Sequence, residues 1–148
     1  MKHIRNKVIS DIAGLLTASP TNWDRVFTQR IMTERTLRTY LMVYFESESA
    51  EKLNISAPAT YRMTVQLHID AVMRIADYED LESAIGNVAG EIQTKVTELT
   101  VAAASANITA LSLIDTSVSI NEDQPAFAIM GQTWLVTYMM TDGNPLVA

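Results

Sequence analysis

The chain has 148 residues, of which 48% are hydrophobic and 19% charged, and its net charge at neutral pH is −6. This composition is typical of one folded domain spanning residues 1–148 and excludes wholesale disorder. The chain contains no cysteine, which excludes disulfides, thiolate metal sites and a cysteine nucleophile.

The charge is unevenly distributed along the chain. Residues 1–38 contain seven basic and three acidic side chains, whereas residues 39–148 contain four basic and fourteen acidic ones. An acidic protein does not bind nucleic acid by general charge attraction, but the basic N-terminal quarter can meet an acidic partner. The apolar runs are too short for a membrane-spanning helix, and we expect no membrane partner.

The first 45 residues predict a helix followed by strands. Residues 2–17 form an amphipathic helix, with Pro20 after its end. Residues 26–31 are a candidate short strand, and residues 37–45 predict a strand with apolar side chains on both faces. The helix has apolar residues at helical spacing, namely Ile4, Val8, Ile12, Leu15 and Leu16.

The clearest pattern in the sequence is the alternation from Met63 to Ala71. Apolar residues occupy the odd positions and polar residues the even ones, which predicts a strand over about 60–73 with one buried face. The polar stretch before it, residues 46–58, predicts a long loop.

The second half predicts one helix and two strands. Asp77 or Asp80 caps a helix of about 20 residues, whose apolar face runs from Leu81 to Leu99. Residues 108–120 and 127–141 predict strands, with bulges near Asp115 and at Gly131. The expected fold class is α+β, a mainly antiparallel sheet of four to five strands with two helices packed on one face.

Polar residues offer little chemistry that the sequence can specify. His68 and Asp70 share a strand face, either as a base with an orienting carboxylate or as a plain polar surface, which we favour. The acidic residues at 77, 79, 80 and 82 lack a calcium-loop spacing, so a helix cap explains them better than a metal. We therefore expect no catalytic residue, metal or cofactor.

The second helix carries a stripe of small residues roughly opposite its apolar face, which predicts either a subunit contact or a chance solvent face. Two glycines inside an exposed helix cost about 1 kcal/mol each relative to alanine, and such a stripe lets another backbone approach closely. The stripe consists of Ser83, Gly86, Gly90, Thr94 and Thr97.

Several phrases in the chain resemble a known family. They include Ile12-Ala13-Gly14-Leu15-Leu16 in the first helix, Arg25-Val26-Phe27 followed by Arg30, and Val43-Tyr44-Phe45-Glu46 before the alternating strand. With the order of the elements, they resemble the tail terminator (tail completion) proteins of long-tailed phages, of the lambda minor tail protein U kind. The resemblance covers nearly the whole chain, although no invariant chemical motif defines the family.

The resemblance implies a structural role in a virion, at the head-proximal end of the tail, after assembly in the host cytoplasm. Six copies would form a ring that caps the tail tube, stops its polymerisation and offers a docking face to a head-completion or neck protein. DNA would pass through the lumen without specific binding.

The resemblance also implies roles for several charged residues. Glu46, Glu48 and Glu51 are expected to line or flank the lumen. Four arginines are equally candidates for contacts with acidic neighbours or for plain solvated surface, namely Arg25, Arg30, Arg35 and Arg38. Two alternatives remain: a neck, head-completion or tube subunit of a phage, or a small ligand-binding or enzymatic α+β domain.

Overall fold

The computed structural model describes residues 2–18, 22–29, 38–55, 58–74, 80–102, 108–121, 127–141 and 146–147, with the side chains of 2–4, 99–102 and 146–147 left out. The chain forms a five-stranded sheet in the order β2-β3-β4-β6-β5, together with a two-stranded pair of β1 and β7. Its strands are β1 (Lys2–His3), β2 (Arg25–Phe27), β3 (Thr39–Lys52), β4 (Thr60–Arg74), β5 (Ile108–Asn121), β6 (Phe127–Thr141) and β7 (Leu146–Val147).

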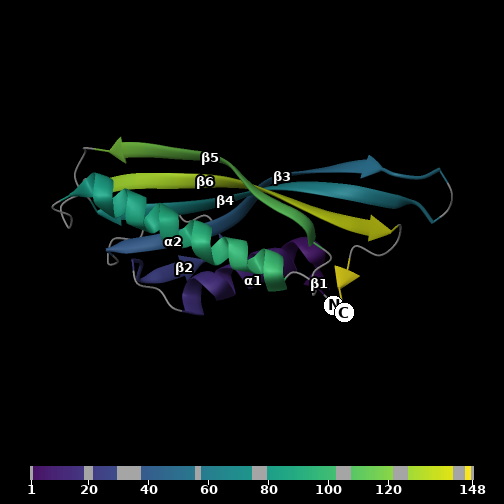
Figure 1. The fold of residues 1–148 in the computed structure, drawn as a ribbon, viewed down its shortest axis with the longest axis horizontal. Helices are drawn as coiled ribbons and strands as arrows, with labels where there is room; N and C mark the ends of the chain where they lie inside the picture. The colour runs from purple at the N-terminus through teal and green to yellow at the C-terminus, as the bar shows by residue number, and fades with distance from the viewer. Residues whose placement is uncertain are drawn as a thin grey trace.

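Helices α1 (Ile4–Ala18) and α2 (Leu81–Ala102) lie on the same side of this sheet (Figure 1). We call that side the helix face and the other side the open face. Within the five-stranded sheet, β2 is parallel to β3 and all other pairs are antiparallel. The expected α+β class, with a mainly antiparallel sheet and two helices on one face, is confirmed.

The core lies between the helices and the central strands. In β4 the odd-numbered side chains from Met63 to Met73 are buried, as the alternating pattern predicts, and they pair in register with the even-numbered residues of β6. From the helices, Val8, Ile12 and Leu16 of α1 and Val88, Ile92 and Val96 of α2 complete the core.

Strand β3 is longer than the sequence predicts. The predicted loop at 46–58 is wrong in its first half, because β3 continues to Lys52 and pairs with β4 to Tyr61. A register shift between Phe45 and Ser47 means that the side chains after it lie on the faces opposite to those that an unbroken alternation would give them. The resulting hairpin extends beyond the two helices (Figure 1), so its side chains need no apolar alternation.

One of the two predicted bulges is present. The β5–β6 register shifts between Leu113 and Asp115, as predicted, whereas both ladders of β6 run through Gly131 without a break, so the predicted bulge there is wrong. This glycine serves another purpose, because a Cβ at Gly131 would lie 2.9 Å from Asp70 Oδ1. The missing side chain leaves room for the Asp70 carboxylate on the open face.

Helix α2 starts with the predicted cap. Asp80 Oδ1 accepts a hydrogen bond of 3.1 Å from the backbone N–H of Ser83, and Oδ2 accepts one of 3.0 Å from the Ser83 hydroxyl. These bonds favour the ionised carboxyl and lower the pKa of Asp80. The alternative cap, Asp77, lies outside the described residues.

Candidate functional site

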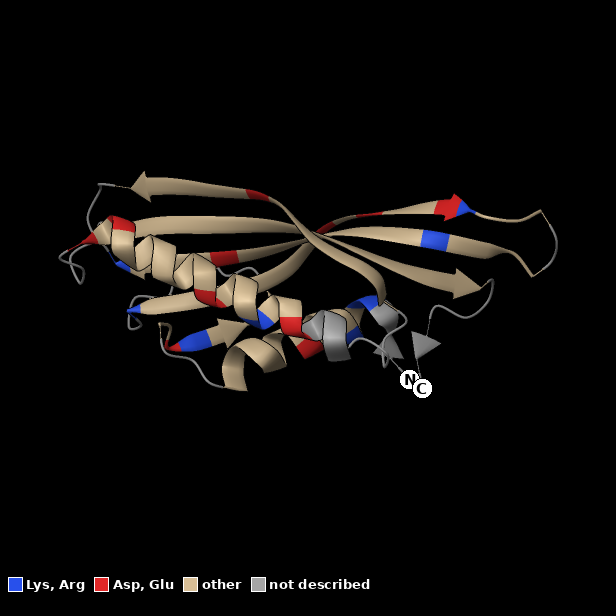
Figure 2. Cartoon of the chain, in the orientation of Figure 1, with Lys and Arg blue, Asp and Glu red and all other residues tan. Residues whose placement is uncertain are grey.

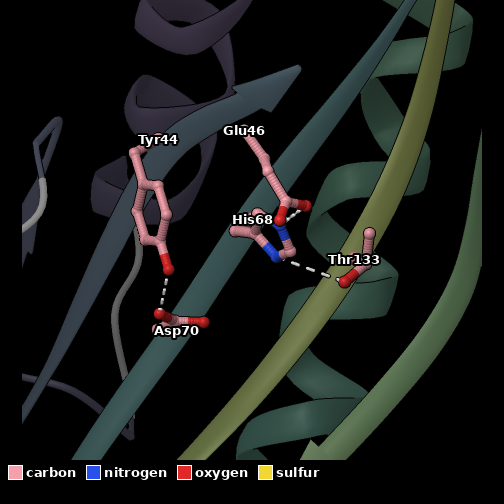
Figure 3. A network of polar contacts seen from close by, with 5 residues as sticks. All are labelled: Tyr44, Glu46, His68, Asp70 and Thr133. Atoms are coloured by element: carbon pink, nitrogen blue, oxygen red, sulfur yellow. Dashed lines mark hydrogen bonds and ion pairs between the residues drawn. The ribbon is translucent and has the colours of Figure 1, made fainter.

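A row of polar side chains crosses the open face in the middle of the sheet (Figure 3). Tyr44 donates its hydroxyl proton to Asp70 Oδ2 at 2.5 Å, and its ring stacks on His68 with 5.5 Å between centroids. His68 Nε2 lies 2.5 Å from Glu46 Oε2, and its Nδ1 lies 3.2 Å from Thr133 Oγ1. We call these five residues the open-face cluster.

In the cluster a carboxylate (Glu46), an imidazole (His68) and a hydroxyl (Thr133) are linked in that order, as in sites of nucleophilic catalysis. A carboxylate oxygen only accepts, so His68 Nε2 carries a proton, and in the neutral ring Nδ1 accepts the Thr133 hydroxyl. Hydrolytic sites, however, place the nucleophile on a sharp turn or beside a helix start, where backbone N–H groups are directed at an oxyanion. Here Glu46, His68 and Thr133 come from three neighbouring strands of a paired sheet. The geometry therefore favours a rigid polar surface over a catalytic site.

A second network lies on the helix face, where β3 and β6 leave the core. Tyr138 donates a hydrogen bond to Glu48 Oε1, and Glu48 Oε2 lies 3.3 Å from Arg5 Nη1 of α1. The Arg5 guanidinium also lies 5.3 Å from the centre of the Phe45 ring. Burial of the Tyr138 phenol, and then its bond to the Glu48 carboxylate, raise the pKa of Tyr138.

The three glutamates that the sequence places in a loop lie on strand β3 instead, and they do not share a face. Glu46 belongs to the open-face cluster, and Glu48 to the network on the helix face. Glu51 lies near the hairpin end and forms an exposed ion pair with Arg62 at 3.2 Å. Each acidic side chain therefore has a partner within the chain, and the guanidinium groups of Arg5 and Arg62 offset the negative charge of Glu48 and Glu51.

The small-residue stripe of α2 is exposed along its length. A Cβ added at Gly86 or Gly90 would meet nothing within 4 Å. The hydroxyl of Thr94 donates to the Gly90 carbonyl at 2.9 Å, and that of Thr97 to the Gln93 carbonyl at 2.9 Å. Because both threonine hydroxyls donate to backbone carbonyls of the helix itself, a neighbour packed on the stripe would need to supply few new hydrogen bonds.

Two of the four predicted contact arginines are described. Arg25 is exposed at the start of β2 and lies 4.4 Å from the centre of the Phe27 ring. Arg38 is exposed just before β3, where its backbone N–H donates to Asp24 Oδ2 at 2.9 Å. Basic residues thus lie on and beside the β2 edge of the sheet (Figure 2). Arg30 and Arg35 lie outside the described residues.

No group of three or more His, Asp or Glu side chains among the described residues has the arrangement to hold a metal ion. Asp77 and Glu79 lie outside this part of the chain. Neither described helix has the length and apolar character to cross a membrane.

The sequence reading identified His68, Asp70 and Glu46 but missed their aromatic and hydroxyl partners. Tyr44 and Thr133 lie on the open face only because of the register of β3 and β6 with β4. The sequence could have predicted that Tyr138 faces the core, because it follows the polar Thr137 in the alternating pattern of β6. Its bond to Glu48 depends on the unpredicted bulge in β3.

No family model and no curated protein matches this sequence. Among solved structures, a chain described as "Virion of native gene transfer agent (GTA) particle" is similar in fold, with a TM-score of 0.56 and 10% sequence identity. The match covers 95% of this chain and 100% of that chain. At this level of identity, the likeness establishes a shared fold.

Proposed function

We propose that the protein is a structural subunit of a phage-type particle, and specifically a tail terminator. The observation that supports a subunit of a phage-type particle is the match to a gene transfer agent virion chain over essentially the full length of both chains. The more specific role of tail terminator rests on the sequence resemblance alone. The structure adds a sheet with one face covered by helices and one face carrying internally bonded polar groups.

The proposed assembly is a ring of six copies. A repeated head-to-tail contact closes a ring without leaving an open end, which suits a protein that must stop the growth of a tube. The α2 stripe is the proposed subunit contact, because its exposed glycines admit a neighbouring backbone. On one side the ring would meet the tail tube protein, and on the other a head-completion or neck protein.

The three glutamates of β3 are not equally good candidates to flank the lumen. Glu46 and Glu51 lie where the open face and the hairpin reach solvent, and they are the candidates to flank a lumen through which DNA passes. Glu48 is a weaker candidate, because Tyr138 and Arg5 bind its carboxylate on the helix face. A surface with few free cations lets phosphates pass without binding.

The exposed Arg25 and Arg38 are proposed to contact an acidic neighbour. They lie on and beside β2, and a guanidinium there can pair with carboxylates in two parallel hydrogen bonds. Arg30 and Arg35 are retained as candidates from the sequence alone.

The direct experiment measures assembly state and its consequence together. Native mass spectrometry of the purified protein over a range of concentrations should show a hexamer in addition to the monomer. Added to polymerising tube protein, the hexamer should shorten the tubes seen by electron microscopy. Incorporation along the tube would instead favour a tube subunit, and a monomer that leaves tube length unchanged would contradict the proposal.

A pair of glycine variants tests the stripe. Gly86→Leu with Gly90→Leu should abolish the hexamer and leave the folded monomer, since each added side chain enters open space. The matched control is Gly14→Leu in α1, another exposed helical glycine with nothing within 4 Å of its Cβ. A hexamer that survives the α2 changes would remove the stripe from the interface.

An enzymatic function is the second candidate, and the open-face cluster is the observation that favours it. If Thr133 were a nucleophile activated by His68, the wild-type protein would hydrolyse an activated ester and His68→Ala would not. We expect equal, background rates for both proteins.

A further inference from the structure

The large apolar side chains that stay exposed among the described residues lie in two places. Leu53 and Ile55, in the loop of the β3–β4 hairpin, are 40% and 101% exposed, and we call them the hairpin patch. Val118 and Ile120, near the end of β5, are 48% and 51% exposed, and we call them the β5 patch. The remaining one, Ile114, lies at the register shift of β5.

The loop that carries the hairpin patch is closed at its base. The backbone N–H of Leu53 donates to the Thr60 carbonyl at 2.8 Å, and the backbone N–H of Thr60 donates to Asn54 Oδ1 at 2.8 Å. A loop that is already closed loses little conformational entropy when it enters a contact. The fully exposed Ile55 is therefore presented in a form suited to packing against a neighbour.

The β5 patch continues the apolar layer of the core beyond its cover. By register, Val118 lies opposite Met130 and Ile120 opposite Ala128 on the helix face, and both β6 residues are 0% exposed. The layer that the helices bury on β6 is thus left half exposed on β5. An exposed apolar strip of this kind is typical of a surface that a partner covers.

The two patches lie at opposite ends of the molecule. The hairpin loop is at one end of the long axis and the last residues of β5 are at the other, and the hairpin extends beyond the helices (Figure 1). A copy therefore offers a projecting apolar loop at one end and an uncovered apolar strip at the other. Two different surfaces in this arrangement favour a head-to-tail contact between copies.

The charges beside the patches are of opposite sign. Next to the hairpin patch, Glu51 and Arg62 form an ion pair, and the exposed Lys52 adds a positive charge. At the end of the molecule where β5 ends, α2 begins on the helix face with the exposed Asp80 and Glu82 (Figure 2). This distribution favours the approach of one patch to the other over the approach of two equal ends.

We infer that the hairpin patch of one copy packs on the β5 patch of the next copy and forms the subunit junction of the ring. The inference rests on the proposed ring and names the surfaces that meet in it. The occupant of the β5 patch is a second copy of this chain, because each copy carries both surfaces at opposite ends. The contact lies on the same side of the sheet as the α2 stripe, so that both belong to one junction.

The absence of cysteine in the natural sequence permits a direct test. Ile55→Cys is combined in turn with Val118→Cys and with Ile120→Cys in one chain. Because a disulfide needs Cα atoms within about 7 Å, a bond between these distant ends must join two copies. Under mild oxidation, at least one double variant should give a ladder of covalent multimers up to the ring. Each single variant should stay uncrosslinked, because a head-to-tail contact does not bring identical positions together.

Lysine variants give an independent measurement by native mass spectrometry. Ile55→Lys, and separately Val118→Lys with Ile120→Lys, should each raise the concentration for half-assembly about tenfold or more, because an unpaired charge is costly in an apolar contact. Mixed in equal amounts, the two variants should form a dimer and nothing larger. The first retains an intact β5 patch and the second an intact hairpin patch, so a single junction remains possible.

Ser119→Lys is the matched control. Ser119 is exposed and lies between the two β5 positions, but its register partner Ile129 places it on the open face. This variant should assemble like the wild type. All the lysine variants should keep the circular dichroism and thermal midpoint of the monomer, because surface substitutions change stability little.

The outcomes separate the two proposals. A hexamer that forms normally in both lysine variants, with no ladder from either cysteine pair, would overturn the junction and leave the ring standing. An equal loss of assembly in Ser119→Lys would show that the contact is not confined to the helix face, which also overturns it. A wild-type protein that stays monomeric at every concentration would overturn both.

Discussion

Strands β5 and β6 are neighbours in the same sheet, yet their helix-face side chains have opposite surroundings. Ala128 and Met130 of β6 are 0% exposed, whereas their register partners Ile120 and Val118 of β5 are about half exposed. The two helices are wide enough to cover the middle of the sheet but not this end of its edge strand. The difference teaches that register decides which side chains share a face, while the position of the helices decides which of them are buried.

The largest expected effect compares a covered apolar side chain with an uncovered one. Leu67→Ala, in the buried row of β4, should lower the free energy of unfolding by about 2–5 kcal/mol, because it removes contacts and leaves a cavity. Val118→Ala on β5 should change it by about 0.5 kcal/mol or less, as for other surface sites. Urea unfolding at concentrations that keep the protein monomeric measures both. Similar losses would show that the β5 end is covered in the monomer.

A medium effect concerns Tyr138, at the border of the covered region. Tyr138→Phe should lower the free energy of unfolding by about 1.5–3 kcal/mol near pH 7, because the hydroxyl donates to the charged Glu48. The pKa of Tyr138 is raised in the folded protein, so the folded state prefers the protonated phenol. The stability from this preference is complete below the ordinary tyrosine pKa of about 10 and is lost as the pH rises above it.

Unfolding measured from pH 8 to 11 tests the sign. The wild-type free energy of unfolding should fall more steeply above about pH 10 than that of Tyr138→Phe. Parallel curves for the two proteins would mean that the phenol is not held protonated by its surroundings.

The smallest effect compares glycines in open and crowded places. Gly90→Ala, on the exposed side of α2, should raise the free energy of unfolding by about 1 kcal/mol, since alanine favours the helix and its Cβ enters open space. Gly131→Ala should lower it, because the new Cβ would lie 2.9 Å from Asp70 Oδ1 in the middle of the sheet. Thermal unfolding of the two variants gives the comparison, and a stabilised Gly131→Ala protein would contradict the crowding on the open face.

The elements with a strong period were predictable from the sequence. The alternation in β4 and the apolar face of α2 gave correct element types and faces, because burial on one side repeats at the strand or helix period. The switch of apolar parity around Asp115 likewise predicted the bulge that β5 contains. The predicted bulge at Gly131 was wrong, because a glycine in a strand is compatible either with a bulge or with the close approach of another group. Here the approaching group is the carboxylate of Asp70 on the neighbouring strand, which the sequence pattern does not reveal.

The candidate surfaces were less predictable than the fold. Glu46, Glu48 and Glu51 look like one acidic group in the sequence, but the bulge after Phe45 and the strand period divide them between two faces. The exposed edge of β5 also has no local signal. Whether a strand is an edge depends on the order of all strands in the sheet, and this order is set by pairings between residues far apart in the chain.

The pairing of β1 with β7 places the beginning and the end of the described chain side by side, with Lys2 opposite Val147 and His3 opposite Leu146. A fluorescent or electron-dense label fused at either end would therefore mark the same corner of the subunit. In images of a particle, the radius and height of that mark would orient the subunit with respect to the particle axis. Two fusions that mark different positions would show that this short ladder opens on assembly.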